Sequence, residues 1–544
     1  MYIDSASSTQ GGRTYRRHLL RESYRQEGKV KHRTIANLSH CSEAEIAAIK
    51  LALRHKGDLA QLGSRKDLTL HQGSRLGAVF TLKVVAQRLG LVQALGHQRP
   101  GKLALWQVLA RLLEQGSRLS AVRLAESHSA ADILGLEAFN EDHLYHNLAW
   151  LTQHQEEIEQ RLFRRRYGEA PPQLFLYDVT SSYLEGVNNI LAAFGYNRDG
   201  KKGKQQLVIG LLTGPEGAPA AVRVFAGNTS DPKTVTEQVR TLAQGFGVRQ
   251  VTLVGDRGML KLPQLQALQE QEFHYITAIT KAQIRQLLKT GAFQMHLFDQ
   301  DLAEVEIDKV RYILRRNPQR VVEMAQTRQN KLEALKSKLT DKQGYLQQHP
   351  RANSEIARNK LADYAKLLQI DRWVQVTLHD RTLALAIDQE AWAYETQLDG
   401  CYVIKTDLPA NTATAAAIHQ RYKDLAQVER AFRTFKNGHL EIRPTFVQTE
   451  ASTRGHVFVV MLAYLLEREL DRYWRHLDLT VSEALDELGA LRGVELTWGA
   501  ATCQQVPQAT GLSRQLLTSA DITLPGALPL RKVHVATRKK LSRN

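Results

Sequence analysis

The stretches Leu174-Phe-Leu-Tyr-Asp178-Val-Thr180 and Val251-Thr-Leu-Val-Gly-Asp256-Arg-Gly258 share one pattern, an apolar run that closes on an aspartate. Short apolar runs with β-branched residues, bounded by Gly and Pro, predict buried strands. An aspartate at the end of a central strand is costly to bury unless a cation or hydrogen bonds satisfy it. Both aspartates are therefore candidates for a functional site, although turn and cap roles are common for single aspartates at strand ends.

Around these two runs, the sequence changes from helix-like to alternating elements. The pattern predicts the order β-β-β-α-β-α-β, which is typical of a mixed sheet covered by helices. The expected strands are Gln173–Thr180, Lys204–Thr213, Pro219–Gly227, Gln250–Val254 and Phe273–Ile279. The expected helices are Leu262–Gln271 and a helix that begins at Asp231-Pro232 and ends at about Gln244, with the proline in its first turn.

A third stretch, from Tyr422 to Lys436, predicts one helix within residues 412–437. At about 100° per residue, Tyr422, Glu429, Arg433 and Lys436 fall within an arc of about 60°, beside an apolar arc. A carboxylate, two cations and a phenol would then face a protected site that suits a phosphodiester and a metal ion. With Asp178 and Asp256, Glu429 completes a set of three carboxylates.

Three carboxylates can hold two divalent ions about 3.5–4 Å apart and support in-line phosphoryl transfer. One ion would activate the attacking oxygen, and the other would stabilise the leaving oxygen. Hard oxygen ligands favour Mg²⁺, or Mn²⁺, over zinc. The metal ligands are therefore expected to be Asp178, Asp256 and Glu429.

The size and charge of the chain limit its class. At 544 residues it is too long for one core, so two to four domains are expected. A net charge of +17 favours a polyanionic partner, nucleic acid first and an anionic membrane second, although a basic soluble protein without such a partner also fits. Three scattered cysteines argue against a cysteine-rich zinc site, and the longest apolar run, Val457–Leu466, is too short to span a bilayer. We expect a soluble, intracellular protein.

Composition divides the chain into six predicted regions. Residues 76–168 are helix-like and fit either a DNA-binding domain or a structural cap. In residues 281–410, a predicted insertion, the lysines and arginines fit either a solvated face or a DNA-binding surface. The regions are 1–75, basic with strand and helix; 76–168, helical; 169–280, first part of the core; 281–410, a β-rich insertion with a helical hairpin; 411–480, second part of the core; and 481–544, with a basic tail formed by Arg531, Lys532, Arg538, Lys539, Lys540 and Arg543.

The chain resembles bacterial insertion-sequence transposases of the DDE class, in the group with the Tyr-x2-Arg-x3-Glu-x6-Lys signature. Tyr422, Glu429 and Lys436 match the signature, Asp178 matches the first acid in Tyr-Asp-Val-Thr, and Asp256 matches the second in Asp-Arg-Gly. The segments 195–200 and 227–231 also resemble family blocks. The resemblance implies an α/β fold with a ribonuclease H-like mixed sheet, a β-rich and helical-hairpin insertion, a mainly helical N-terminal DNA-binding region and a helical C-terminal region.

The resemblance also implies cut-and-paste DNA transposition. Water would nick double-stranded DNA at the element's terminal inverted repeats, and the exposed 3′-hydroxyl would attack target DNA, both steps being assisted by two Mg²⁺ ions. The group works as a homodimer that bridges two DNA ends, without a membrane, in the cytoplasm and on the nucleoid. Two other functions stay open: a catalytically silent DNA-binding derivative, and a ribonuclease H-like nuclease that cuts without joining.

One position departs from the signature, because Leu425 stands where an arginine is expected. Arg433 lies on the same predicted arc as Glu429, so it is a candidate for the missing phosphate contact; the alternative is that it pairs with a nearby carboxylate. In the family, the Tyr and Arg grip a terminal phosphate and assist a hairpin pathway, which the leucine puts in question here. The expected DNA-phosphate contacts are Tyr422, Arg433, Lys436 and Arg257.

Three further patterns are weaker. Gly195-x4-Gly200-Lys201-Lys202 nearly matches a P-loop but lacks the Ser/Thr and precedes a strand, which argues against an NTPase. Trp373 and Trp392 fit core packing better than base stacking. His439 and His456 fit structural roles better than a place near the site.

Overall fold

The computed structural model describes residues 1–10, 13–57, 68–437, 440–498, 501–529, 531, 533 and 535–541. The chain forms two compact units. One unit comprises residues 1–81, 127–135 and 484–533, and the other comprises residues 82–126, 136–483 and 534–544. All candidate catalytic residues belong to the second unit.

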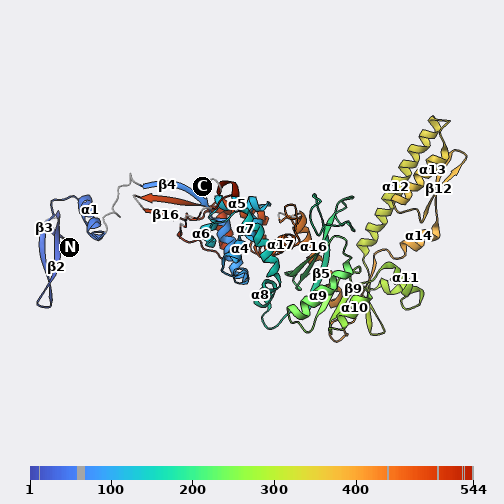
Figure 1. Ribbon diagram of the computed structural model, residues 1–544, viewed down its shortest axis with the longest axis horizontal. Coiled ribbons are helices and arrows are strands. Elements are labelled where there is room, and N and C mark those ends of the chain that lie inside the picture. The colour runs from blue at the N-terminus through green and yellow to red at the C-terminus, as the bar shows by residue number, and fades with distance from the viewer. Residues whose placement is uncertain are drawn as a thin grey trace. The chain divides into compact units, whose positions relative to one another are not determined.

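The first unit contains two separate sheets. Strands β1 (Tyr2–Gln10), β2 (Arg13–Gln26) and β3 (Lys29–Asn37) form an antiparallel sheet, followed by helix α1 (Glu43–Arg54), which begins with a capping box between Ser42 and Glu45. The second sheet has the order β17-β16-β15-β4, from β4 (Leu68–Arg75), β15 (Arg492–Trp498), β16 (Ala501–Gln505) and β17 (Ala527–Leu528) (Figure 1). Residues before 76 and after 480, which composition separates, therefore share one sheet.

Most of the predicted helical segment before the core is helical. The helices are α2 (Gly77–Arg88), α3 (Leu91–Leu95), α4 (Arg99–Leu113), α5 (Arg118–Ser127), α6 (Ala130–Leu134), α7 (Glu141–Gln153) and α8 (Gln155–Tyr167). The later helix α17 (Glu450–Trp474) packs against α4 and α7, so this layer backs the core through a helix from the far end of the sequence. The remaining helices are α18 (Val481–Gly489), α19 (Gly511–Ser519) and α20 (Arg538–Leu541).

The core sheet has eight strands in the order β10-β11-β14-β9-β8-β5-β6-β7. Strands β5 (Leu174–Tyr183), β6 (Gln206–Thr213) and β7 (Pro219–Ala226) form an antiparallel meander, while β8 (Thr252–Gly255) runs parallel to β5 and β9 (His274–Ala278) runs parallel to β8. With α9 (Asp231–Arg240) and α10 (Leu262–Gln269), the predicted order β-β-β-α-β-α-β is confirmed. Helix α9 ends four residues earlier than predicted and continues as a π-helical turn over Thr241–Gly245.

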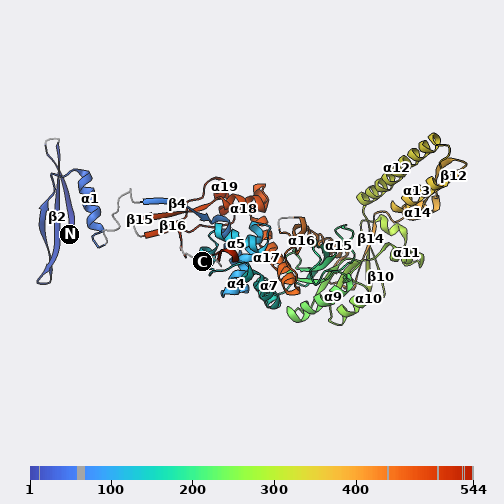
Figure 2. The same cartoon turned by 45° about the horizontal axis from the view of Figure 1, so that its top comes forward.

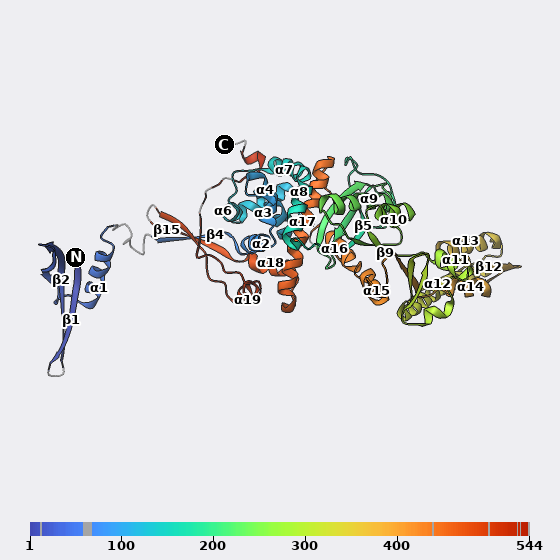
Figure 3. The ribbon, with the colours of Figure 1, turned by 90° about the horizontal axis from the view of Figure 1, so that it is seen from below.

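The two faces of the core sheet carry different helices (Figure 3). On β5, the alternate residues Phe175, Tyr177 and Val179 are buried with apolar residues of α8, α9 and α10. Successive strand residues point to opposite faces, so Asp178 faces the other side. That side is covered by α15 (Ala415–Lys423), which contacts β8 and β9, and α16 (Ala426–Asn437), which contacts β5 and β6.

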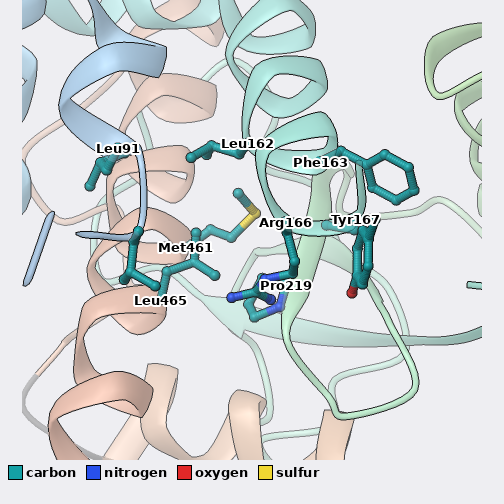
Figure 4. A pocket seen from close by; sticks show the side chains of 10 residues that line it. Leu91, Leu162, Phe163, Arg166, Tyr167, Pro219, Met461 and Leu465 are labelled. Carbon is teal, nitrogen blue, oxygen red and sulfur yellow. The ribbon is translucent and has the colours of Figure 1, made fainter. Parts of the chain in front are cut away.

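A small apolar cavity lies in the second unit between α8, β7 and α17 (Figure 4). It is lined by Leu162, Phe163, Met461 and Leu465 among others, and its volume is about 30 Å³. That space admits roughly two water molecules at most. The cavity is a gap in core packing, and none of the candidate catalytic residues lines it.

Part of the predicted β-rich insertion joins the core sheet. Strands β10 (Ala303–Ile307), β11 (Val310–Arg316) and β14 (Cys401–Thr406) extend the core sheet beyond β9. Strands β10 and β11 form a hairpin that turns at Asp308 and Lys309, whose φ angles are 50° and 63°. These left-handed turn positions carry no glycine, so the usual sequence signal for a hairpin turn is missing.

The middle of the insertion has its own hydrophobic core. Helices α12 (Pro318–Gln348) and α13 (Ser354–Leu367) pack with the hairpin β12 (Val374–His379) and β13 (Thr382–Ile387), as Figure 2 shows, and α14 (Gln389–Thr396) follows. Trp373 is buried and meets Trp392 edge to face at 4.5 Å between ring centroids. The preference for core packing over base stacking is thereby supported for Trp373. Helix α11 (Lys281–Lys289) follows β9 and precedes β10.

Candidate active site

The strand register brings the first two candidate acids together. Strands β5 and β8 are parallel, and Tyr177 pairs with Gly255, so Asp178 and Asp256 occupy neighbouring positions one residue further on. The carboxyl ends of parallel strands are a common place for ligand sites, because side chains from adjacent strands converge there. Here the convergence places two carboxylates side by side.

The sequence predicts that Asp178 lies at the end of its strand, but in the structure the strand continues beyond it. Strand β5 continues to Tyr183 because its other neighbour, β6, pairs with it along the whole stretch from Asp178 to Tyr183. The strand that ends at this level is β8, and Asp256 follows its last residue, Gly255. Asp178 therefore stands in the middle of a central strand at the point where its parallel neighbour stops.

The predicted single helix over 412–437 is also wrong, because it is two helices. Helix α15 ends at Lys423 and α16 begins at Ala426, so the break falls at Asp424 and Leu425. The assumption of one continuous helical wheel from Tyr422 to Lys436 therefore fails. Tyr422 on α15 and Glu429 on α16 nevertheless reach one region. The reason is that α15 covers β8, α16 covers β5, and these two strands are neighbours in the sheet.

The electrostatics of Asp178 connect it with both other acids. Burial, with smaller contributions from the negative charges of Asp256 and Glu429, raises the pKa of Asp178 to about 7. The backbone N–H of Val179, which donates to Asp178 Oδ1 at 2.8 Å, and the charge of Arg198 act in the opposite direction. A mostly buried carboxyl close to two other acids is a feature of functional sites, since the folded protein alone does not balance the charge.

Tyr422 reaches the second acid. Its hydroxyl donates to Asp256 Oδ1 at 3.4 Å, and burial together with the charge of Asp256 raises the pKa of Tyr422 well above its usual value. The phenol is therefore protonated at neutral pH. It acts as a hydrogen-bond donor beside the carboxylate.

Lys436 has a partner that the sequence analysis did not assign. Its Nζ lies 2.6 Å from Asp199 Oδ1, and both side chains are mostly buried. Asp199 also accepts from the backbone N–H of Tyr183 at 3.2 Å, so it joins α16 to the end of β5. The resemblance of segment 195–200 to a family block is the sequence signal that points to Asp199.

A second cation near Asp178 was also missed. Arg198 lies 2.6 Å from both carboxylate oxygens of Asp231, the first residue of α9. The charge of Arg198 lowers the pKa of Asp178, so the guanidinium lies within electrostatic reach of the site. Arg198 and Asp231 belong to the two segments that resembled family blocks, 195–200 and 227–231, although neither residue was proposed for the site.

The two remaining candidate phosphate contacts are exposed arginines. Within the described residues, the side chains of Arg257 and Arg433 have neither a hydrogen-bond nor an ion-pair partner. The alternative that Arg433 pairs with a nearby carboxylate therefore finds no support. Leu425, at the signature arginine position, lies in the break between α15 and α16 and is partly exposed.

The donor set has the chemistry of a divalent-cation site, but its geometry is not that of a closed one. Among the side chains that the structure describes, no group of three or more His, Cys, Asp or Glu residues is arranged to hold a metal ion. The three acids supply hard oxygen ligands, and two of them raise the pKa of the third. Asp256 and Glu429 are exposed, so their side chains have room to adopt other rotamers.

Two family models match the sequence. One, described as the transposase DDE domain, matches residues 169–466, which is more than half of the chain, and the other, described as the N-terminal domain of IS1634 family transposases, matches residues 3–65. The chain belongs to the DDE transposase family. It is a DNA transposase of the bacterial insertion-sequence type, and this class of enzyme uses divalent metal ions.

Other comparisons add little to the family match. The chain is similar to the piggyBac transposase in a cryo-EM synaptic complex with hairpin DNA, at 7% identity and a TM-score of 0.34, over 71% of this chain and 69% of that one. A similarity of this size carries no argument about the present transposase. No curated protein matches the chain.

The remaining expectations about the transposase concern its histidines and the membrane. His456 is buried and bonded, as a structural histidine should be, whereas His439 lies outside the described residues, as do Lys532 and Arg543 of the basic tail. No helix in the described part of the transposase combines the length and apolarity needed to cross a bilayer.

Proposed function

We propose that this transposase cleaves DNA at the terminal inverted repeats of its element and joins the ends to target DNA, with Asp178, Asp256 and Glu429 as its catalytic carboxylates. The proposal rests above all on the register that places Asp178 beside Asp256 on adjacent parallel strands. The pKa of Asp178, which rises through burial and the charges of the other two acids, links Glu429 to the pair.

We further propose that the core is ribonuclease H-like. The order β9-β8-β5-β6-β7, with an antiparallel meander and two parallel strands, supports this assignment. Asp178 then lies on β5, the central strand of these five, and Glu429 lies on α16, which packs on this strand. Strands β14, β11 and β10 continue the sheet on the far side of β9. They therefore add no strand next to β8 and β5, the strands that carry the acids.

Metal binding in this proposal uses the three acids as ligands for two Mg²⁺ ions, or Mn²⁺. Bound divalent ions would lower the pKa of an attacking water or 3′-hydroxyl and neutralise charge that develops on the phosphate. Asp178 is held in place by the N–H of Val179, so it is the fixed ligand. Asp256 and Glu429 are exposed, and their side chains would turn toward Asp178.

The cations around the acids have distinct proposed roles. Tyr422 donates to Asp256 and so orients this carboxylate. Arg257 and Arg433 have no partners among the described residues and would contact DNA phosphates, for which the planar guanidinium is well suited. Lys436 is bound to Asp199, so a phosphate contact by Lys436 requires that this ion pair open or that DNA approach from its free side.

The assembly and location remain proposals as well. A homodimer would bring two element ends together, and the net charge of +17 suits binding of both the ends and the target duplex. The predicted place of action is the cytoplasm, on the nucleoid. The predicted domain boundaries stay proposals, with residues 76–168 as the candidate DNA-binding region.

The test is a cleavage and strand-transfer assay with Mg²⁺ and DNA taken from the flanks of the reading frame, alongside a separate end-binding assay. We expect Asp178→Ala, Asp256→Ala and Glu429→Ala each to abolish cleavage while end binding persists. Asp363→Asn, at an exposed acid of α13, is the matched control and should cleave normally. Full cleavage by all three alanine variants would refute the assignment.

The same assay separates the other two functions. Cleavage without joining by the unmodified protein would support a ribonuclease H-like nuclease. End binding without cleavage would support a catalytically silent derivative. All three acids are present and two are adjacent, which favours the active transposase.

A further inference from the structure

A second cavity lies in the same unit as the catalytic acids, and none of the three acids lines it. Its volume is about 230 Å³, and it is enclosed by the end of α4, the start of α5, the segment before α17 and α17 itself. Two of its lining residues are Arg111 and Arg118, and we call it the Arg111–Arg118 pocket.

Both arginines are buried without an acidic partner. Arg111 is 5% exposed and Arg118 is 4% exposed, and within the described residues neither forms an ion pair with a carboxylate. Arg111 donates from Nη2 to the carbonyl of Gly116 at 3.1 Å, and Arg118 donates from Nη2 to His456 Nδ1 at 3.3 Å. The Nε atoms of both arginines are buried and have no hydrogen-bond partner. Buried charges are normally paired, so this arrangement is costly unless an anion enters.

The remaining charges of the pocket do not balance the two arginines. Glu441 is the acidic residue that lines the pocket, and both of its carboxylate oxygens are already bound to Arg443. His456 is neutral, because burial and the charges of the two arginines lower its pKa well below the usual value. Burial also lowers the pKa of Arg111 to about 10 and that of Arg118 to about 9, and both remain protonated at neutral pH. Arg111, Arg118 and Arg443 thus face one carboxylate.

The pocket is connected to the catalytic strand. Arg443 donates from Nη1 to the hydroxyl of Tyr183 at 2.5 Å, and Tyr183 is the last residue of β5. Five residues separate Tyr183 from Asp178, which corresponds to about 16 Å along a strand. A smaller cavity of about 80 Å³, lined by Tyr183, shares Arg443, Pro444, Thr445 and Val447 with the pocket. The smaller cavity therefore adjoins the Arg111–Arg118 pocket on one side and the end of β5 on the other.

We propose that the Arg111–Arg118 pocket binds a phosphate group of the DNA strand that passes the active site, and so holds that strand at a second point. The inference rests on the proposed function for its ligand, since a DNA-cleaving enzyme brings phosphates to this face. Phosphate oxygens match the planar donor array of a guanidinium, and two arginines whose Nε atoms have no hydrogen-bond partner line the same pocket. Arg111 and Arg118 are positioning residues here, because they do not touch the reacting atoms.

The first experiment measures phosphate binding by the full chain in metal-free buffer. Thermal unfolding is recorded with increasing inorganic phosphate and, separately, with chloride at matched ionic strength. We expect phosphate to raise the unfolding temperature more than chloride does, and Arg118→Gln to weaken phosphate affinity at least tenfold. Arg320→Gln, at an exposed arginine of α12, is the matched control and should behave like the unmodified protein.

Stability without phosphate provides an independent readout. If the arginines served only to anchor the surrounding loops, Arg118→Gln would unfold at a lower temperature. Because Arg118 is a buried charge without an acidic partner, we expect the variant to unfold at the same or a higher temperature. Arg111→Lys, which keeps the charge and removes the planar donor array, is the second variant and should also lose phosphate affinity. The inference is overturned if phosphate has no effect on the unmodified protein, or if both variants bind phosphate as tightly as the unmodified protein does.

A second experiment identifies the source of the phosphate. A short single-stranded oligonucleotide with a 5′-phosphate competes with inorganic phosphate, and the same oligonucleotide with neutral methylphosphonate linkages and no 5′-phosphate serves as the comparison. Competition by the charged oligonucleotide that Arg118→Gln weakens supports a DNA phosphate; binding of inorganic phosphate alone overturns the assignment to DNA.

The two proposals fail separately. Asp178→Asn should abolish cleavage and leave phosphate binding intact. Cleavage by a protein that does not bind phosphate in the pocket would overturn only the pocket. Phosphate binding by a protein that does not cleave would overturn only the proposed function.

Discussion

Replacing Asp178 by asparagine should make the metal-free protein more stable while abolishing cleavage. Burial, with the charges of Asp256 and Glu429, raises the pKa of Asp178 to about 7. The side chain is therefore ionised at pH 8 in an environment that disfavours its charge. Asparagine has nearly the same shape, and its amide oxygen can still accept from the N–H of Val179. The substitution removes the unfavourable charge and little else.

The magnitude follows from the difference between the folded and unfolded pKa values. The unfolded value is near 3.9, so ionising Asp178 in the folded protein costs about 4 kcal/mol at pH 8. Between the two pKa values the folded state binds more protons, and the stability of the unmodified protein falls by about 1.4 kcal/mol per pH unit from pH 4 to pH 7. The advantage of Asp178→Asn should accordingly be about 1–2 kcal/mol at pH 5 and about 3–4 kcal/mol at pH 8.

Scanning calorimetry in EDTA is the suitable assay, because the chain forms two units and more than one transition is expected. The comparison is between the unmodified protein, Asp178→Asn and the exposed control Asp363→Asn, each at pH 5 and pH 8. Adding Mg²⁺ at pH 8 should stabilise the unmodified protein, since a bound cation favours the ionised carboxylate, and should stabilise Asp178→Asn less. Identical pH dependence in Asp178→Asn and the unmodified protein would refute the argument that Asp178 carries an unbalanced charge.

Two further substitutions test the cations around the acids. Arg433→Ala should change stability by less than about 0.5 kcal/mol, because the side chain is exposed and has no partner among the described residues, yet it should reduce strand cleavage and lower the salt dependence of DNA binding by about one phosphate contact. Wild-type cleavage, with end binding checked separately, would contradict this role. Lys436→Met and Asp199→Asn should each destabilise the metal-free protein by about 2 kcal/mol, and their double-mutant cycle should show a coupling of about 1–2 kcal/mol. Additive effects in denaturant unfolding would show that the 2.6 Å pair contributes nothing.

Local patterns in the sequence predicted the elements of the core well. The apolar runs before Asp178 and Asp256 are strands, and the proline after Asp231 lies in the first turn of α9. These features depend on neighbouring residues, through backbone preferences and the burial of short apolar runs. For the same reason, the sequence could identify both aspartates as candidates, since an acid directly after a buried run is itself a local feature.

Other features involve residues that are far apart in the chain, and local patterns carry little information about them. The hairpin β10–β11 lacks a glycine at its turn, and its place in the core sheet depends on β14, more than 80 residues later. The break at Asp424 and Leu425 was missed because the apolar period continues across it, whereas the two helices cover different strands.

The family, the order of the core elements and the acids that carry the proposed chemistry were thus predictable from the chain alone. The folded structure was needed to see that Lys436 binds Asp199, that Arg198 binds Asp231, and that Arg111 and Arg118 share a cavity without an acid of their own. The difference lies in the range of the interactions. Strand and helix formation follow from residues a few positions apart, whereas the partner of a buried charge is chosen by packing between distant segments.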